Sequence, residues 1–245
     1  MPYETLGILG GVGPLASVYF ADLLVCGTDA DCDQAHIPFY LYNDACIPDR
    51  SAYLLGRSPE SPLPALVDGV KKLASMGSDL IVVTCNTAHY FYDEMASAVD
   101  VPVLNIIETA VDAAEKKAPR LKKFGILATD GTVKGEVYDR VADRRGLQCV
   151  APSEETQEAV MKLIYDVKVG KDVDPAVILR AAQELEDAGC EAVILGCTEL
   201  SVVARRYRLP DEDPALVDAM TALAAACVAL CGKKWKEPDE RCVVN

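Results

Sequence analysis

Short runs of β-branched and other apolar residues alternate with longer helical stretches along the chain, and this alternation limits the folds available to it. We predict strands at Leu6–Leu9, Phe39–Tyr42, Leu80–Val83, Val103–Ile106, Phe124–Ala128, Gln148–Val150 and Ala192–Leu195. Between them, two stretches with apolar residues at helical spacing are each followed by a glycine: Pro64–Met76 by Gly77, and Pro175–Ala188 by Gly189. Strands that alternate with helices form parallel sheets covered by helices, so the sequence predicts an α/β fold.

The chain also contains a weak internal repeat. The segment LGILG at 6–10 is similar to FGILA at 124–128, and LIVVTCNT at 80–87 is similar to AVILGCTE at 192–199. Two matches in the same order, at nearly the same offset, predict two similar three-layer halves, each a mostly parallel sheet flanked by helices. We expect the halves to join around the charged stretch Glu115–Lys123. A chance similarity between short Gly/Val/Ile strands is the alternative.

Each half places a cysteine at the carboxyl end of a predicted strand, Cys85 in one and Cys197 in the other. Ligands of open parallel sheets bind beyond these ends. Small polar residues follow each cysteine and could begin a helix, so we expect backbone N–H groups and the helix dipole to favour the thiolate. If both sulfurs face one cleft, one can remove a proton from a substrate carbon while the other delivers a proton to the opposite face. The pair therefore predicts a racemase or epimerase, for which no cofactor is required.

Composition excludes several other classes. Lys and Arg total 24 against 38 Asp and Glu, and the net charge of −14 argues against nucleic-acid and anionic-membrane partners. The longest nearly apolar run, Met220–Cys231, is short of the ~20 residues that span a bilayer, and no basic region precedes the apolar start, so we expect a cytoplasmic protein. No CxxC and only two histidines are present, so we expect no metal site. Packing is the expected role of Cys26, Cys46, Cys149, Cys190, Cys227, Cys231 and Cys242.

Three spaced motifs resemble the aspartate/glutamate racemase family: Gly10-Gly11-Val12-Gly13-Pro14, Cys85-Asn86-Thr87-Ala88-His89 and Gly196-Cys197-Thr198-Glu199-Leu200. The similarity covers essentially the whole chain, although Val12 stands where many relatives have methionine. It implies cofactor-independent racemisation by two cysteines, two pseudo-symmetric α/β domains with the active site in the cleft between them, and a homodimer. It also implies that a final helix, Pro214–Leu230, returns to the first domain. The domains would then comprise residues 1–117 plus 210–245, and residues 118–209.

An acidic amino-acid substrate requires groups that bind its two carboxylates. Arg50 lies in a loop after the Phe39–Tyr42 strand and can hold a carboxylate through two parallel hydrogen bonds. Lys168 lies in a segment similar to one that, in the family, contributes a basic residue to the side-chain carboxylate of the substrate. A solvated surface charge is an equally good interpretation of Lys168. For the α-carboxylate we expect donors from Asn86, Thr87, Thr129 and Thr198, with Gly131 and Thr132 as weaker candidates; Gly11 is a further expected substrate-binding residue. Glu199 and His89 are given no proton-transfer role.

Two readings from other classes remain. The first is a dinucleotide-binding enzyme, because Gly11–Ala16 fits the GxGxxA motif and Asp44 lies near the position of the acidic residue that binds the ribose. This interpretation gives no role to the two strand-end cysteines. A non-catalytic amino-acid-binding protein would keep Arg50 and the threonines but would need neither thiol. Within the family resemblance, a broad-specificity racemase, a hydantoin racemase or a maleate isomerase is the alternative to our expectation, which is racemisation of aspartate, glutamate or both.

Overall fold

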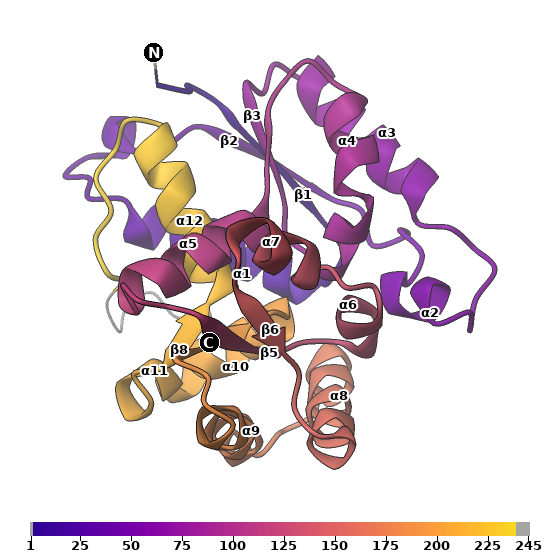
Figure 1. The fold of residues 1–245 in the computed structure, drawn as a ribbon. Coiled ribbons are helices and arrows are strands. Elements are labelled where there is room, and N and C mark those ends of the chain that lie inside the picture. The colour runs from indigo at the N-terminus through magenta and orange to yellow at the C-terminus, as the bar shows by residue number, and fades with distance from the viewer. Residues whose placement is uncertain (1, 239–245) are drawn as a thin grey trace.

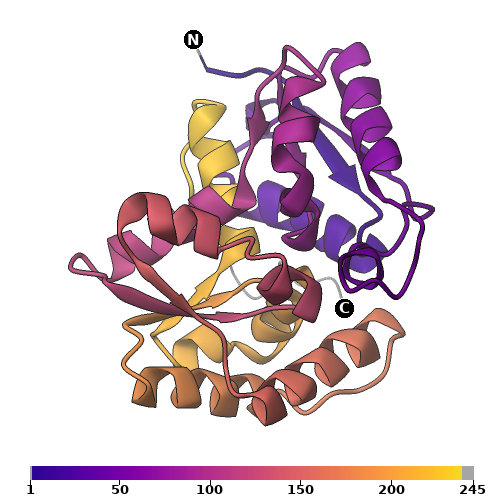
Figure 2. The ribbon, with the colours of Figure 1, turned by 45° about the vertical axis from the view of Figure 1, so that its right-hand side comes forward.

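The structure, a computed structural model that describes residues 2–238, contains two parallel four-stranded sheets (Figures 1 and 2). The first has the order β2-β1-β3-β4, with β1 Leu6–Gly10, β2 Phe39–Asn43, β3 Leu80–Val83 and β4 Val103–Leu104. The second has the order β6-β5-β7-β8, with β5 Lys123–Leu127, β6 Gln148–Val150, β7 Ala192–Leu195 and β8 Leu216–Asp218. The predicted α/β class with two parallel sheets is confirmed.

Helices cover both sheets and connect the parallel strands. They are α1 Pro14–Gly27, α2 Arg50–Leu54, α3 Leu63–Ser75, α4 Tyr92–Ser97, α5 Ile106–Lys117, α6 Asp130–Lys134, α7 Asp139–Arg145, α8 Glu154–Lys168, α9 Ala176–Asp187, α10 Thr198–Tyr207, α11 Leu209–Glu212 and α12 Ala219–Leu230, with short 3-10 turns η1 Asp33–Ala35 and η2 Thr87–Phe91. The two predicted stop glycines follow α3 and α9 with φ of +94° at Gly77 and +88° at Gly189. No helix within residues 2–238 is long and apolar enough to cross a membrane.

The internal repeat extends through the whole strand order, because β1 to β4 of the first half correspond to β5 to β8 of the second. Even the caps agree: Asn105 before α5 and Asp218 before α12 both have φ −87° and ψ 114°, and each side chain accepts a hydrogen bond from the second residue of its helix. Helices α5 and α12 pack against each other and against residues from both sheets in one shared hydrophobic core (Figure 1). This shared core fixes the two halves relative to each other.

Two predicted elements differ from the structure. The expected helix Pro214–Leu230 begins only at Ala219, because buried Leu216 and Val217 extend along β7 as strand β8. The segment 210–245 was expected to belong to the first domain, but its residues 216–218 lie in the second sheet. Helix α12, which follows them, packs on α1 and α5. The strand predicted at Val103–Ile106 ends at Leu104, because the Asn105 side chain caps α5.

Candidate active site

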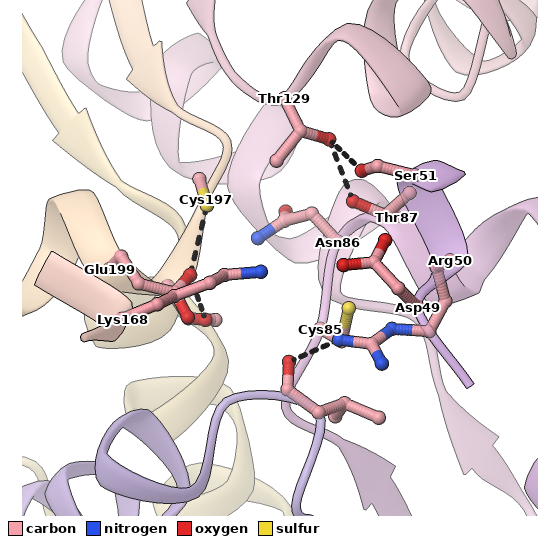
Figure 3. Close-up of a pocket in the computed structure, with 12 residues that line it drawn as sticks. Asp49, Arg50, Ser51, Cys85, Asn86, Thr87, Thr129, Lys168, Cys197 and Glu199 are labelled. Carbon is pink, nitrogen blue, oxygen red and sulfur yellow. Dashed lines mark hydrogen bonds between the residues drawn. The ribbon is translucent and has the colours of Figure 1, made fainter. Parts of the chain in front are cut away.

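A cleft lies between the two halves, at the carboxyl ends of both sheets (Figure 3). The first half contributes Val12, Asp49, Arg50, Ser51, Cys85, Asn86 and Thr87, and the second half contributes Thr129, Lys168, Cys197, Thr198 and Glu199. The structure therefore brings together both predicted cysteines and the predicted binding residues, except Gly11 and the weaker candidates Gly131 and Thr132. Gly11 lines a neighbouring groove that opens beside the cleft.

The glycine-rich turn after β1 is filled by protein groups. Gly11 has φ +85°, a Cβ there would overlap the Asp44 backbone at 2.1 Å, and its N–H donates to Ser17 Oγ at 3.0 Å. A Cβ on Gly13 would lie 2.6 Å from Oε1 of Glu199. Because a carboxylate beside the turn repels phosphate, these contacts disfavour the dinucleotide reading and make the role of Gly11 conformational.

The Cys85 turn is held by a buried histidine. Cys85 follows β3 and is 6% exposed, and its carbonyl accepts a hydrogen bond from His89 Nδ1 at 2.8 Å. The other ring nitrogen, Nε2, accepts from the Ile106 N–H at 3.3 Å, which ties the turn to the start of α5. Burial lowers the pKa of His89 to about 4. The imidazole is therefore neutral at neutral pH, and it positions the backbone of Cys85.

Cys197 has a different environment, which corrects the expectation of a helix-stabilised thiolate. It immediately precedes α10, and its Sγ donates a hydrogen bond to Glu199 Oε2 at 3.0 Å; the Thr198 hydroxyl donates to the same oxygen at 3.2 Å. Burial and the Glu199 charge raise the pKa of Cys197 well above its usual range, against the opposing charge of Lys168. The carboxylate at bonding distance outweighs the partial charge of the helix end, so Cys197 holds its proton.

Lys168, the last residue of α8, reaches into the cleft with its ammonium group between Glu199 and Asp49 (Figure 3). Burial of the ammonium opposes its charge, but Glu199, followed by Cys197, raises the pKa of Lys168 above its ordinary value. The lysine is therefore a cation placed to stabilise a thiolate or a bound carboxylate. The Lys168 residue as a whole is exposed, as the surface-charge interpretation expects, but its side chain also lines the cleft.

Arg50 begins α2 and is 7% exposed. Its Nη1 donates to the carbonyls of Pro48 at 3.0 Å and Ile47 at 3.3 Å, and its Nη2 donates to the Val12 carbonyl at 3.0 Å. These bonds use three of the five guanidinium N–H donors and leave Nε buried without a partner in the part of the chain that the structure describes. Arg50 therefore ties its loop to the glycine-rich turn and still has donors for a carboxylate.

A cluster of hydroxyl groups joins the two halves at the back of the cleft. Ser51 Oγ donates to Thr129 Oγ1 at 3.0 Å, and Thr87 Oγ1 lies 3.0 Å from Thr129 Oγ1 (Figure 3). Thr87 Oγ1 also lies 2.8 Å from Thr132 Oγ1. Thr129 also caps α6 by accepting from the Thr132 N–H at 3.2 Å. Such hydroxyls can rotate to donate to a bound anion.

Sequence reasoning missed Asp49 and Ser51 and left Glu199 without a role. The position of Asp49 before a helix is an N-cap signal, and its side chain does accept from the Ala52 N–H at 2.8 Å. Among the remaining cysteines, Cys190, Cys227 and Cys231 are buried as expected and Cys149 is half-buried, but Cys26 is disulfide-bonded and Cys46 is exposed; Cys242 lies outside the described residues. No group of three or more His, Cys, Asp or Glu side chains in residues 2–238 could hold a metal ion.

Comparisons with known proteins agree with the geometry. Residues 9–227 match the family described as Asp/Glu/hydantoin racemase. The chain is 29% identical over 231 residues to the broad-specificity amino-acid racemase RacX of Bacillus subtilis, covering 91% of this chain and 96% of that protein. The aspartate racemase of Picrophilus torridus superposes with a TM-score of 0.76 at 33% identity, covering 95% of this chain and 96% of the other. An aspartate racemase homologue from Pyrococcus horikoshii shares the fold, with a TM-score of 0.74 at 23% identity, over 94% of this chain and 99% of the other.

Proposed function

The chain belongs to the Asp/Glu/hydantoin racemase family and is an amino-acid racemase, and we propose that it inverts the α-carbon of aspartate or glutamate without a cofactor. One observation carries the proposal: a cysteine from each half lines the same cleft, among hydroxyl, amide and basic side chains. This is the arrangement that a two-base exchange of the Cα proton requires.

In one direction, the Cys85 thiolate removes the Cα proton while the Cys197 thiol delivers its own proton to the opposite face. The reaction leaves Cys85 protonated and Cys197 as thiolate, which is the form that the reverse reaction requires. Lys168 lies where its charge favours the Cys197 thiolate, and Glu199 favours the Cys197 thiol. These opposed charges keep both forms of the second cysteine accessible.

The substrate carboxylates have separate sets of donors. Thr87, Thr129 and Asn86 would bind the α-carboxylate and stabilise the negative charge that spreads onto it as the Cα proton leaves. The unpaired N–H of Arg50 and the Lys168 ammonium would bind the side-chain carboxylate. This division supports a dicarboxylic amino acid.

A broad-specificity racemase is the second candidate, and the groove beside the cleft favours it. The two acidic and two basic side chains of the cleft balance, so the site has no formal excess of positive charge for a second carboxylate. The adjoining groove is lined largely by apolar residues: Pro14, Leu15, Ala16, Ala45, Ile47, Val167 and Val202. Longer neutral side chains would fit there.

A chiral-product screen of the common amino acids, in D₂O and without added cofactor, tests the proposal. We expect deuterium at Cα of both enantiomers of aspartate, glutamate or both, and loss of most racemisation in Cys85→Ser and in Cys197→Ser. Exchange of neutral amino acids as well would select the broad-specificity candidate, and exchange confined to neutral amino acids would contradict the proposal. If either serine variant kept full activity, the two-cysteine assignment would be wrong.

We also propose that the chain forms a homodimer. Helix α1 is rich in apolar residues on all sides, yet Leu15, Val18 and Val25 are exposed on its outer face. A helix of this composition is normally buried. Light scattering of the purified protein would give the mass of a dimer, and a monomer at micromolar concentration would contradict the proposal.

A further inference from the structure

Tyr138 lies between the segments that carry the two cysteines, and none of the roles assigned above uses it. It directly precedes α7 and is fully buried, and its ring packs edge to face on Phe124 of β5, with ring centroids 6.4 Å apart. A tyrosine in this setting needs a partner for its hydroxyl.

The hydroxyl of Tyr138 finds that partner in the other half of the molecule. It donates to Oδ1 of Asn86 at 2.7 Å, next to Cys85. Burial raises the pKa of Tyr138 well above its usual range, so the hydroxyl stays protonated and acts as the donor. Because the amide oxygen is used in this way, the amide nitrogen must face the opposite direction.

That nitrogen faces the cleft. Asn86 is 2% exposed, and its Nδ2 is buried without a partner among residues 2–238. Figure 3 shows it directed into the space in front of Cys197 and Lys168. An unpaired buried donor is costly, and its presence in a cleft of this kind is explained by a ligand that supplies the acceptor.

The ring of Tyr138 also contacts the segment of the other cysteine. A Cβ on Gly196, the residue before Cys197, would lie 3.1 Å from Cε2 of Tyr138 and 3.4 Å from its Cζ. The ring therefore rests on backbone that a glycine leaves open. One buried side chain thus touches Asn86 on the Cys85 side and Gly196 on the Cys197 side.

We propose that Tyr138 is a positioning residue for racemisation: its hydroxyl fixes the Asn86 amide so that the NH₂ group, and not the oxygen, meets the α-carboxylate of the substrate. This inference rests on the proposed function. Removal of the Cα proton shifts negative charge onto the carboxylate, so a donor at this place strengthens its bond as the transition state forms. A reversed amide would instead set two oxygens against each other.

A double-mutant cycle tests the proposal. We expect Tyr138→Phe, which keeps the ring, to lower kcat about 10- to 100-fold while KM changes less than threefold, as for a lost transition-state donor. In an Asn86→Ala background the same substitution should have no further effect on kcat, because the group that it orients is absent. Tyr92→Phe is the matched control, since its hydroxyl donates to the Val103 carbonyl at 2.9 Å outside the cleft; its kcat should equal that of the wild type. If Tyr138→Phe lowered kcat equally in both backgrounds, its effect would be structural and the proposal would fail.

A second measurement needs no variant and no activity. Neutron diffraction of the wild-type protein distinguishes the deuterated NH₂ of Asn86 from its oxygen, and we expect the nitrogen on the cleft side. An oxygen on that side would overturn the proposal. A wild-type protein that exchanged no amino-acid Cα proton would instead refute the proposed function, and the orientation of the amide would still be measurable.

Discussion

Replacing Gly13 with alanine should separate a stability effect from an effect on the acid–base pair. Gly13 precedes α1 with φ +127° and ψ 99°, a backbone conformation that residues with a Cβ rarely adopt. Such a conformation costs about 1–3 kcal/mol. The new methyl group would also lie 2.6 Å from Oε1 of Glu199, whereas its next neighbours are at 3.4 Å or more. Since that oxygen ends a flexible side chain, the Glu199 carboxylate would move, and the clash would add little to the loss of stability.

The displaced carboxylate is the one that accepts hydrogen bonds from Cys197 at 3.0 Å and Thr198 at 3.2 Å. If the Glu199 carboxylate moves, the Cys197 thiol loses the hydrogen bond that orients it in the cleft. A misplacement of about 1 Å in a catalytic arrangement can cost on the order of 100-fold in rate. We therefore expect Gly13→Ala to lower kcat by about 10- to 100-fold.

Gly77→Ala is the matched control. Gly77 has φ +94° at the end of α3, and a Cβ there would meet no described residue within 4 Å. Urea unfolding should show a loss of about 1–3 kcal/mol for both variants, from the same kind of backbone strain. Thermal unfolding should shift by about 2–4 °C per kcal/mol in a chain of this size. Racemisation measured by circular dichroism at 25 °C should fall only in Gly13→Ala, and equal activity in the two variants would refute the reasoning.

Three further predictions concern charge. Lys168→Met should lower kcat/KM about 10- to 100-fold for aspartate or glutamate and less for alanine, as for a lost charge-assisted hydrogen bond. Lys162→Met, on the same helix, is the control. Equal losses on both substrate classes would contradict a role of Lys168 in binding the side-chain carboxylate of the substrate. Glu199→Gln should speed alkylation of Cys197 by iodoacetamide at pH 7, followed by peptide mass spectrometry, because the carboxylate raises the pKa of Cys197; an unchanged rate would exclude that cause. The pKa of His89 is lowered from 6.5 to about 4 in the folded protein, so between these pH values the unfolded chain binds more protons than the folded chain. The contribution of His89 to the free energy of unfolding is therefore full above about pH 6.5 and falls by up to about 3 kcal/mol as the pH drops to 4. His89→Asn should lack this component in urea unfolding at pH 7 and pH 4, and an identical pH dependence in both proteins would contradict it.

The strand-end position of the two cysteines was predictable because parallel strands bring their carboxyl ends to one edge, whatever the distant packing. Strand β8 was not, because three residues carry too little periodicity, and their extended form depends on pairing with β7. The repeat offered a signal that we did not use: Val103-Leu104-Asn105 precedes α5 as Leu216-Val217-Asp218 precedes α12. Aligning the two halves strand by strand would have placed β8 in the second sheet.

The environment of each thiol lay further from what the sequence could predict. The bond from Cys197 to Glu199 depends on side-chain orientation, and the space around that carboxylate depends on Gly13 from the other half. Likewise, Tyr138 meets Asn86 only because the two halves pack together. Local patterns predict which residues gather at a sheet edge, but side-chain contacts within and between the halves decide their protonation and orientation.

These unequal environments have a kinetic consequence that the equilibrium constrains. The Cys197 thiol is held by a carboxylate, whereas the Cys85 turn is held through its backbone by a neutral imidazole. In the resting enzyme Cys197 is therefore the proton donor, which suits the enantiomer whose Cα proton Cys85 removes. Because enantiomers have equal free energies, kcat/KM must be the same in both directions, so the asymmetry can appear only as parallel differences in kcat and KM. Glu199→Gln should change the ratio of the kcat values for the two enantiomers, while the ratio of their kcat/KM values stays at one. An unchanged kcat ratio would mean that Glu199 does not decide which enantiomer the resting enzyme is ready to accept.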